Sequence, residues 1–378
     1  MNERLRRLAE IGQSVWMDSL SRDDIQNGKL ERMIEEGIVG VTSNPTIFQK
    51  AISESSLYDE QLQELAEKED DPKEIFLALA REDIRDACDL LLPVYETTGR
   101  LDGYVSLEVS PDLAYDTLAT VEEATRLHGL VNKPNLMVKI PATLPGLAAI
   151  EEMIATGHSI NVTLIFSLER YRAVTNAYIR GLQRLVAAGG NPSLVASVAS
   201  FFVSRVDTEA DKRLEEVGRK DLQGKLAVAN AKLAYQAFEE IFSGEDWEFL
   251  ESKGATKQRP LWASTSTKNP EYGDVMYVEE LAGPATVNTM PTDTFEAFMD
   301  HGEVRSTSPG GSPIEENLDE ARALIMRLRE AGVDYEDVTE VLEKEGVAKF
   351  ADSFDELLDG IKDKSHRIKS RSASQPVS

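Results

Sequence analysis

The sequence predicts an α/β fold: a single (β/α)8 TIM barrel with helical insertions and extra C-terminal helices. Two observations lead to this prediction. Eight short apolar runs rich in β-branched residues recur along the chain, and amphipathic helical patterns separate them. Strand and helix alternating eight times are typical of a parallel sheet closed into a barrel. The 378 residues fit, because such barrels take about 250 residues and can exceed about 400. An open doubly wound sheet is the alternative.

The eight expected strands follow in chain order, each short and bounded by polar or turn-forming residues. They are 14–18 (SVWMD), 38–43 (IVGVTS), 104–109 (YVSLEV), 135–140 (NLMVKI), 160–166 (INVTLIF), 195–202 (VASVASFF), 260–265 (PLWAST) and 285–290 (ATVNTM). Helical patterns at 147–157, 167–190 and 222–244 end in glycine, which commonly stops a helix.

Two connections are longer than a single helix needs. Residues 48–103 and 207–258 each hold more than one helical pattern and then return to a strand, so we expect helical insertions within the barrel. After the eighth strand, residues 312–332 and 334–361 have the pattern of closing helices. The first of these begins with Ser, Pro and acidic residues, which favour a helix start.

The domain organisation follows from this order. We expect residues 1–360 to form one catalytic barrel. Residues 361–378 are basic, Ser-rich and nearly free of apolar residues, so we expect this tail to be disordered.

Composition excludes several classes of function. Lys and Arg number 41 against 67 Asp and Glu, a formal net charge of −26, which disfavours nucleic acid and anionic membranes as partners. A single cysteine excludes a disulfide framework. No apolar run approaches the roughly 18 residues of a membrane span, and the N-terminus lacks the apolar segment of a secretory signal. We expect a cytoplasmic protein, either a monomer or a homodimer.

Polar side chains gather near the carboxyl ends of the expected strands. In a barrel these ends meet at one mouth, where active sites of this fold are built. Caps and turns also use such residues, so each one alone has a structural explanation. The residues are Asp18, Ser43, Asn44, Glu108, Lys139, Thr163, Ser200, Ser264 and Asn288.

Lys139 stands out because it interrupts the apolar run LMVKI at 136–140. Lysine is seldom fully buried without a partner. Burial among apolar side chains disfavours the charged amine, and a neutral amine is a nucleophile that forms a Schiff base with a carbonyl. A structural lysine paired with Glu108 or Asp18 is the other interpretation.

Several segments resemble the transaldolase family, in its longer bacterial form. Residues 40–48 (GVTSNPTIF) and 136–153 (LMVKIPATLPGLAAIEEM) resemble its two signature motifs. Residues 102–111, 160–171 and 196–207 are similar to further family segments in the same order. The resemblance covers roughly residues 12–305.

The resemblance implies four catalytic residues. Lys139 would form the Schiff base, and Asp18 would be the general acid–base that takes the hydroxyl proton as the carbon–carbon bond breaks. Glu108 and Thr163 would hold a water for imine formation and hydrolysis. Two carboxylates near one lysine suit this division of labour, although either could simply be its charge partner.

The resemblance also implies substrate-binding residues. Asn44 and Ser200 would bind hydroxyls of the three-carbon fragment, and Arg205 would bind the phosphate. A guanidinium suits phosphate geometry, although Asp207 could engage Arg205 in an ion pair. Asn44 could equally shape the turn before the following proline.

One departure from the family pattern concerns the phosphate site. Many members follow the seventh strand with an ASFRN-like segment, whose serine and arginine hold the phosphate. Ser264 matches that serine, but Ser266 stands where the arginine would be. We therefore expect Lys268 to supply the second cation.

The resemblance implies a transaldolase of the pentose phosphate pathway. It would move a dihydroxyacetone unit from sedoheptulose 7-phosphate to glyceraldehyde 3-phosphate, giving erythrose 4-phosphate and fructose 6-phosphate. A class I aldolase that releases free dihydroxyacetone, and a non-catalytic sugar-phosphate-binding barrel, stay open. No cofactor or metal is expected, because an iminium supplies the electron sink and the histidines lack metal-ligand spacing.

Overall fold

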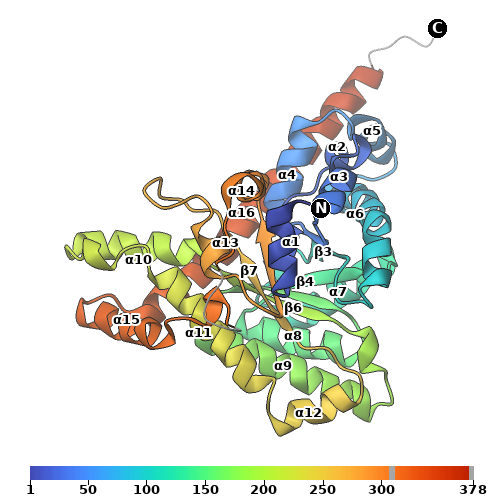
Figure 1. Ribbon diagram of the computed structural model, residues 1–378. Helices are drawn as coiled ribbons and strands as arrows, with labels where there is room; N and C mark the ends of the chain where they lie inside the picture. The colour runs from blue at the N-terminus through green and yellow to red at the C-terminus, as the bar shows by residue number, and fades with distance from the viewer. Residues whose placement is uncertain (306–310, 374–378) are drawn as a thin grey trace.

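Eight parallel strands form the centre of the molecule and close into a barrel in chain order (Figure 1). The computed structural model describes residues 1–305 and 311–373. Each predicted run overlaps one strand, and β1 pairs with β8, which confirms the barrel and excludes the open sheet. The strands are β1 (Gln13–Met17), β2 (Gly40–Thr42), β3 (Tyr104–Glu108), β4 (Leu136–Pro141), β5 (Ile160–Ile165), β6 (Ser197–Phe202), β7 (Arg259–Ala263) and β8 (Thr286–Met290).

Helices surround this barrel and also fill both predicted insertions. Those that follow strands or precede β1 are α1 (Glu3–Glu10), α2 (Arg22–Gln26), α3 (Lys29–Glu36), α7 (Thr117–Val131), α8 (Leu144–Ala155), α9 (Leu168–Ala187), α13 (Met276–Glu280) and α14 (Thr292–His301). The insertions hold α4 (Pro45–Glu54), α5 (Asp59–Ala66), α6 (Pro72–Thr97), α10 (Ser204–Glu216), α11 (Leu226–Ile241) and α12 (Glu245–Ser252). After β8 come α15 (Leu318–Glu330) and α16 (Tyr335–Ala373).

The turn after β4 shows how local sequence fixes the mouth of the barrel. The Thr143 side chain caps α8 by accepting from the Gly146 backbone N–H at 3.0 Å. A Cβ on Gly146 would lie 2.1 Å from the Pro141 carbonyl oxygen, so only glycine allows this close approach. The turn therefore holds the end of β4 in one position.

The opposite, amino-terminal end of the barrel is closed by a buried ion pair. Arg259 lies 2.9 Å from Asp102, and its guanidinium also donates to Ser14 at 2.7 Å. Asp102 accepts from the Trp16 indole at 3.1 Å, so the buried charges are paired and hydrogen-bonded. Active sites of this fold lie at the other, carboxyl-terminal mouth of the barrel.

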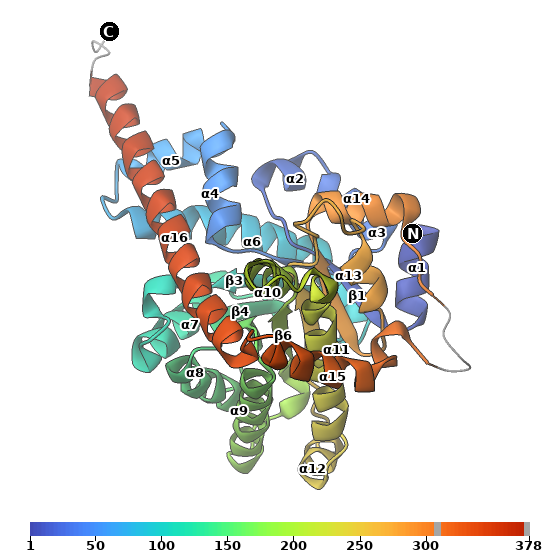
Figure 2. The same cartoon turned by 90° about the vertical axis from the view of Figure 1, so that its left-hand side faces the viewer.

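The long helix α16 crosses that mouth and continues past α4 and α5 (Figure 2). The prediction of a disordered tail from residue 361 is wrong as far as Ala373, because α16 includes these residues. Ile361 is buried, and Lys364 donates to the Ile52 and Ser55 carbonyls at 3.3 Å, so docking on α4 offsets the low apolar content. Residues 374–378 lie outside the described residues.

Within the described ranges, no helix has both the length and the apolar character that crossing a membrane requires.

Candidate active site

Lys139 lies on β4 in the interior of the mouth, level with Glu108 on β3 and Asn161 on β5. It is 5% exposed, and its Nζ donates to the Ser43 carbonyl at 3.1 Å. The same Nζ lies 3.4 Å from Glu108 Oε2. Side chains alternate along a strand, so the apolar neighbours of Lys139 face the helices while the amine faces the barrel axis.

Glu108 and Thr163 each present a buried oxygen without a hydrogen-bond partner among the described residues. The 3.4 Å contact of Glu108 Oε2 with Lys139 is an ion pair, not a well-formed hydrogen bond. Burial raises the pKa of the Glu108 carboxyl, and the nearby Lys139 opposes this shift. Two unsatisfied oxygens beside a lysine are suited to holding a water molecule.

Asp18 follows β1 directly and is oriented by the neighbouring strand. Its backbone N–H donates to the Met290 carbonyl at 2.8 Å, and its Oδ1 accepts from Thr42 Oγ1 at 2.8 Å. Within the described part of the chain Asp18 has no ion pair, so the partner of Lys139 is Glu108. Sequence reasoning missed Thr42, although it lies one residue before the predicted strand end.

Asn44 and Ser200 are held by hydrogen bonds that fix their direction. Asn44 caps α4 by accepting from the Ile47 N–H at 3.0 Å, and it also lines the cavity. The same residue therefore shapes the turn and borders the site. Ser200 donates to Asn161 Oδ1 at 2.7 Å. Asn161 in turn donates to Ser106 Oγ at 3.0 Å. Sequence reasoning missed Asn161, whose signal was its alternation with Thr163 on the inward face of β5.

Arg205 lies in the first turn of α10, and its guanidinium contacts aromatic rings. Its guanidinium carbon is 5.2 Å from the ring centre of Phe202 and 5.8 Å from that of Phe350. Among the described residues the guanidinium makes no ion pair or hydrogen bond. Asp207 instead accepts from the Ala227 N–H at 2.7 Å and the Tyr277 hydroxyl at 2.8 Å. Burial lowers the pKa of the Arg205 guanidinium.

Ser264 and Lys268 end up in different surroundings. Ser264, at the end of β7, has a left-handed φ of 59° and shares a 2.8 Å hydrogen bond with Ser204 Oγ. Lys268 is directed to Ser266 Oγ at 2.6 Å in the following exposed loop and does not line the cavity around Lys139. The sequence alone could not fix the path of that loop.

Seven of the nine predicted site residues line the cavity around Lys139. Glu108 does not line this cavity but forms an ion pair with Lys139, which does. The cavity has a volume of about 70 Å³. It is lined by Asp18, Thr42, Asn44, Lys139, Thr163, Ser200, Phe202, Arg205, Ala263, Ser264, Thr289 and Phe350.

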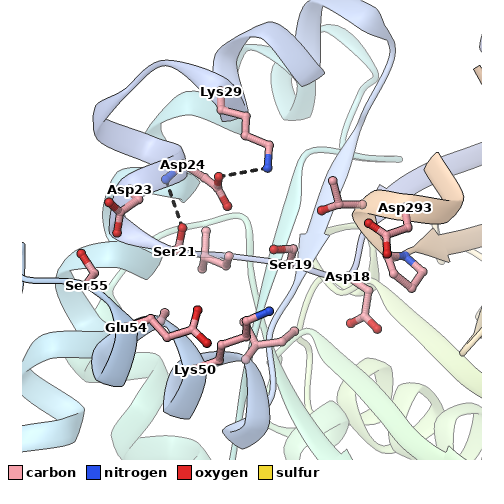
Figure 3. A pocket seen from close by; sticks show the side chains of 15 residues that line it. Asp18, Ser19, Ser21, Asp23, Asp24, Lys29, Lys50, Glu54, Ser55 and Asp293 are labelled. Carbon is pink, nitrogen blue, oxygen red and sulfur yellow. Dashed lines mark hydrogen bonds and ion pairs between the residues drawn. The ribbon is translucent and has the colours of Figure 1, made fainter. Parts of the chain in front are cut away.

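A wider cavity of about 640 Å³ adjoins it on the other side of Asp18 (Figure 3). It lies between the connection after β1, helix α4 and the start of α14. Asp24 pairs with Lys29 at 3.2 Å, and Lys50 and Glu54 also point into this space. Asp18 therefore lies where the two cavities meet.

The site combines an amine with two carboxylates. A buried amine can form a Schiff base with a carbonyl, and carboxylates can transfer protons. Across residues 1–305 and 311–373, no group of three or more His, Cys, Asp or Glu side chains is placed to hold a metal ion.

Comparison with known proteins agrees with this chemistry. The family model described as Transaldolase/Fructose-6-phosphate aldolase matches residues 15–361. A transaldolase of Parafrankia sp. (strain EAN1pec) is 52% identical, covering 96% of this chain and 98% of its own. Transaldolases of Thermobifida fusca and Mycolicibacterium smegmatis are each 50% identical, covering 96% and 95% of this chain and 98% and 96% of their own. The chain belongs to the transaldolase/fructose-6-phosphate aldolase family.

Proposed function

We propose that the protein is a transaldolase that transfers a dihydroxyacetone unit between sugar phosphates through a Schiff base on Lys139. The donor is sedoheptulose 7-phosphate and the acceptor is glyceraldehyde 3-phosphate, as in the pentose phosphate pathway. Its membership of the family and the names of its relatives support this activity. The observation that carries the proposal is the buried Lys139 amine, 3.4 Å from Glu108, in one cavity with Arg205, which makes no ion pair with any described residue.

The proposed reaction begins with attack of the Lys139 amine on the C2 carbonyl of the ketose. Loss of water, assisted by Glu108 and Thr163, gives an iminium. Asp18 then takes the proton of the C4 hydroxyl as the C3–C4 bond breaks, and the aldose leaves. The electron pair of that bond stays on the three-carbon fragment as an enamine, which the acceptor aldehyde captures. Proton return and hydrolysis of the new iminium regenerate the amine.

Each substrate end has a proposed holder. Asn44 and Ser200 bind hydroxyls of the three-carbon unit, and their existing hydrogen bonds pre-orient them. Arg205 binds the phosphate, supported by the lack of an ion pair with any described residue, and Ser264 lines the same cavity. Lys268 acts on the phosphate only after the loop at 264–275 brings it inward, because it bonds Ser266 in the structure.

The test is reduction with borohydride in the presence of fructose 6-phosphate, followed by peptide mass spectrometry. We expect a three-carbon adduct on Lys139 that Lys139→Met abolishes. Lys232→Met is a matched control, because Lys232 is also buried but pairs with Glu280 outside the site. An adduct on another lysine, or none, contradicts the proposal. The rate of dihydroxyacetone release without an acceptor aldehyde is also compared with the rate of transfer when an acceptor is present. Equal rates would identify an aldolase instead.

We further propose that residues 1–360 act as one catalytic domain in the cytoplasm. The single domain is supported by α16, which supplies Phe350 to the cavity, and the cytoplasmic location by the similarity to transaldolases.

A further inference from the structure

Helix α16 is fixed to the mouth of the barrel by contacts with the ends of β4 and β5. Arg170 donates to the Ala142 carbonyl at 2.6 Å and pairs with Glu343 of α16 at 3.1 Å. One turn later Gly346 passes so close to β5 that a Cβ there would lie 3.0 Å from Leu164 Cδ2. The position of the next turn of α16 is therefore set by the barrel itself.

That next turn carries Phe350, which faces the reaction centre. Phe350 is 5% exposed and lines the cavity around Lys139. It also lines a small adjoining space whose other walls include Glu108 and Leu164. One side chain from the last helix thus borders both the amine and the carboxylate of the site.

Phe350 also contacts the cation predicted to bind phosphate. The Arg205 guanidinium carbon lies 5.2 Å from the ring centre of Phe202 and 5.8 Å from that of Phe350. Cation–π contacts of this kind attract a guanidinium without using its N–H groups. The two rings therefore hold Arg205 while leaving its donors free for an anion.

The cavity is too small for a sugar phosphate as it stands. Its volume of about 70 Å³ accommodates a few water molecules. A six- or seven-carbon ketose phosphate bound at Lys139 therefore needs the adjoining cavity of about 640 Å³ beyond Asp18, or movement of a wall side chain. Phe350 is the wall residue that α16 supplies, and it belongs to no strand of the barrel.

We propose that Phe350 is a positioning residue that holds Arg205 for the substrate phosphate and shields the covalent intermediate from bulk water. It thereby favours transfer to an aldehyde over hydrolysis. This inference rests on the proposed Schiff-base function. The reaction it suppresses begins when the enamine carbon is protonated, giving the dihydroxyacetone iminium on Lys139. Water then adds to the C=N carbon, the C–N bond breaks, and free dihydroxyacetone and the protonated amine result.

The test compares three variants of the full chain. Phe350→Ala removes the ring, and Phe350→Leu keeps an apolar wall without the π-face. Phe354→Ala is the matched control, since Phe354 lies one turn further on α16, is equally buried, and packs on Phe76 instead. Each variant is assayed for dihydroxyacetone release relative to transfer, and for KM with fructose 6-phosphate and with unphosphorylated fructose.

We expect Phe350→Ala to raise the release-to-transfer ratio and to raise KM for fructose 6-phosphate at least about threefold, as loss of one cation–π contact predicts. KM for fructose stays unchanged, because fructose has no phosphate for Arg205. Phe350→Leu is expected to keep the release-to-transfer ratio at the wild-type value but to show the same raised KM for fructose 6-phosphate as Phe350→Ala. Phe354→Ala lowers stability and leaves both readouts at the wild-type value.

The outcomes separate the two proposals. No adduct on wild-type Lys139 after borohydride reduction overturns the proposed function. A wild-type adduct together with unchanged ratios and KM values in Phe350→Ala overturns the role of Phe350 alone. If Phe350→Ala does not fold, Phe350→Leu decides the matter: an unchanged KM for fructose 6-phosphate in that variant overturns the positioning of Arg205.

Discussion

Asp207 makes the stability of the protein depend on pH near neutrality. Burial raises the pKa of its carboxyl to about 7, although the Ala227 N–H and the Tyr277 hydroxyl partly oppose the shift. In the unfolded chain the same carboxyl titrates near 3.8. Between these values the folded state binds the proton and the unfolded state does not, so the stabilisation is lost as pH rises from about 4 through 7.

The size of the effect follows from the difference in pKa. At about 1.4 kcal/mol per pKa unit, the group contributes about 3 kcal/mol at pH 5 and close to none at pH 8. Asp207→Asn removes the titration and keeps the geometry, because its amide oxygen can accept from Ala227 and its amide N–H can donate to Tyr277. The free energy of unfolding of the variant, relative to that of the wild type, should therefore rise by about 3 kcal/mol as pH goes from 5 to 8.

Urea unfolding of both proteins at pH 5, 6, 7 and 8 measures this difference. The free energies of unfolding should diverge as pH rises, with Asp207→Asn more stable at the alkaline end. If the difference in free energy of unfolding between the two proteins stays constant within about 0.5 kcal/mol at all four pH values, that would falsify the assignment of a raised pKa to Asp207. Asp211, whose pKa burial also raises, is present in both proteins and cancels in the comparison.

Three further predictions concern other sites. Thr42→Val removes the 2.8 Å hydrogen bond to Asp18, so kcat for transfer should fall at least about tenfold with little change in KM; an unchanged kcat would show that Asp18 needs no such support. Arg205→Ala should raise KM for phosphorylated donors more than Lys268→Ala does, because only Arg205 lines the cavity; the reverse order in steady-state assays contradicts this. Burial, with a smaller effect of the adjacent His158, lowers the pKa of His128 to about 3, so stability is lost as pH falls from about 6.5 towards 3. Between pH 7 and pH 5, the free energy of unfolding of His128→Phe should fall by about 2 kcal/mol less than that of the wild type. Equal falls in urea unfolding would refute this prediction.

The barrel itself could be predicted because its signal is local and repeated. Each strand is an apolar run, and each polar strand end faces one mouth, so the order of the strands alone places Lys139 and Glu108 together. The same reasoning places Asp18 and Ser200 near them. Because neighbouring strands are parallel, the position of a residue along its strand is enough to show which strand-end side chains lie close together, and a single sequence contains that position.

What the sequence could not give depends on packing between distant segments. Phe350 lies more than 200 positions after Lys139, and no periodicity shows that α16 crosses the mouth. Lys268 follows β7 in a loop whose path no pattern fixes. Helix α16 continues beyond residue 361, where Lys364 bonds to the Ile52 carbonyl of α4, a contact that the composition of that segment does not reveal.

Helix α16 is synthesised after all eight strands of the barrel, yet it supplies one wall of the pocket around Lys139. A ribosome finishes every strand long before it reaches residue 350, so a nascent barrel can hold its lysine in place while the pocket still lacks one wall. Loss of α16 by premature termination or proteolysis would then leave a barrel that keeps Lys139 but lacks the wall that Phe350 supplies.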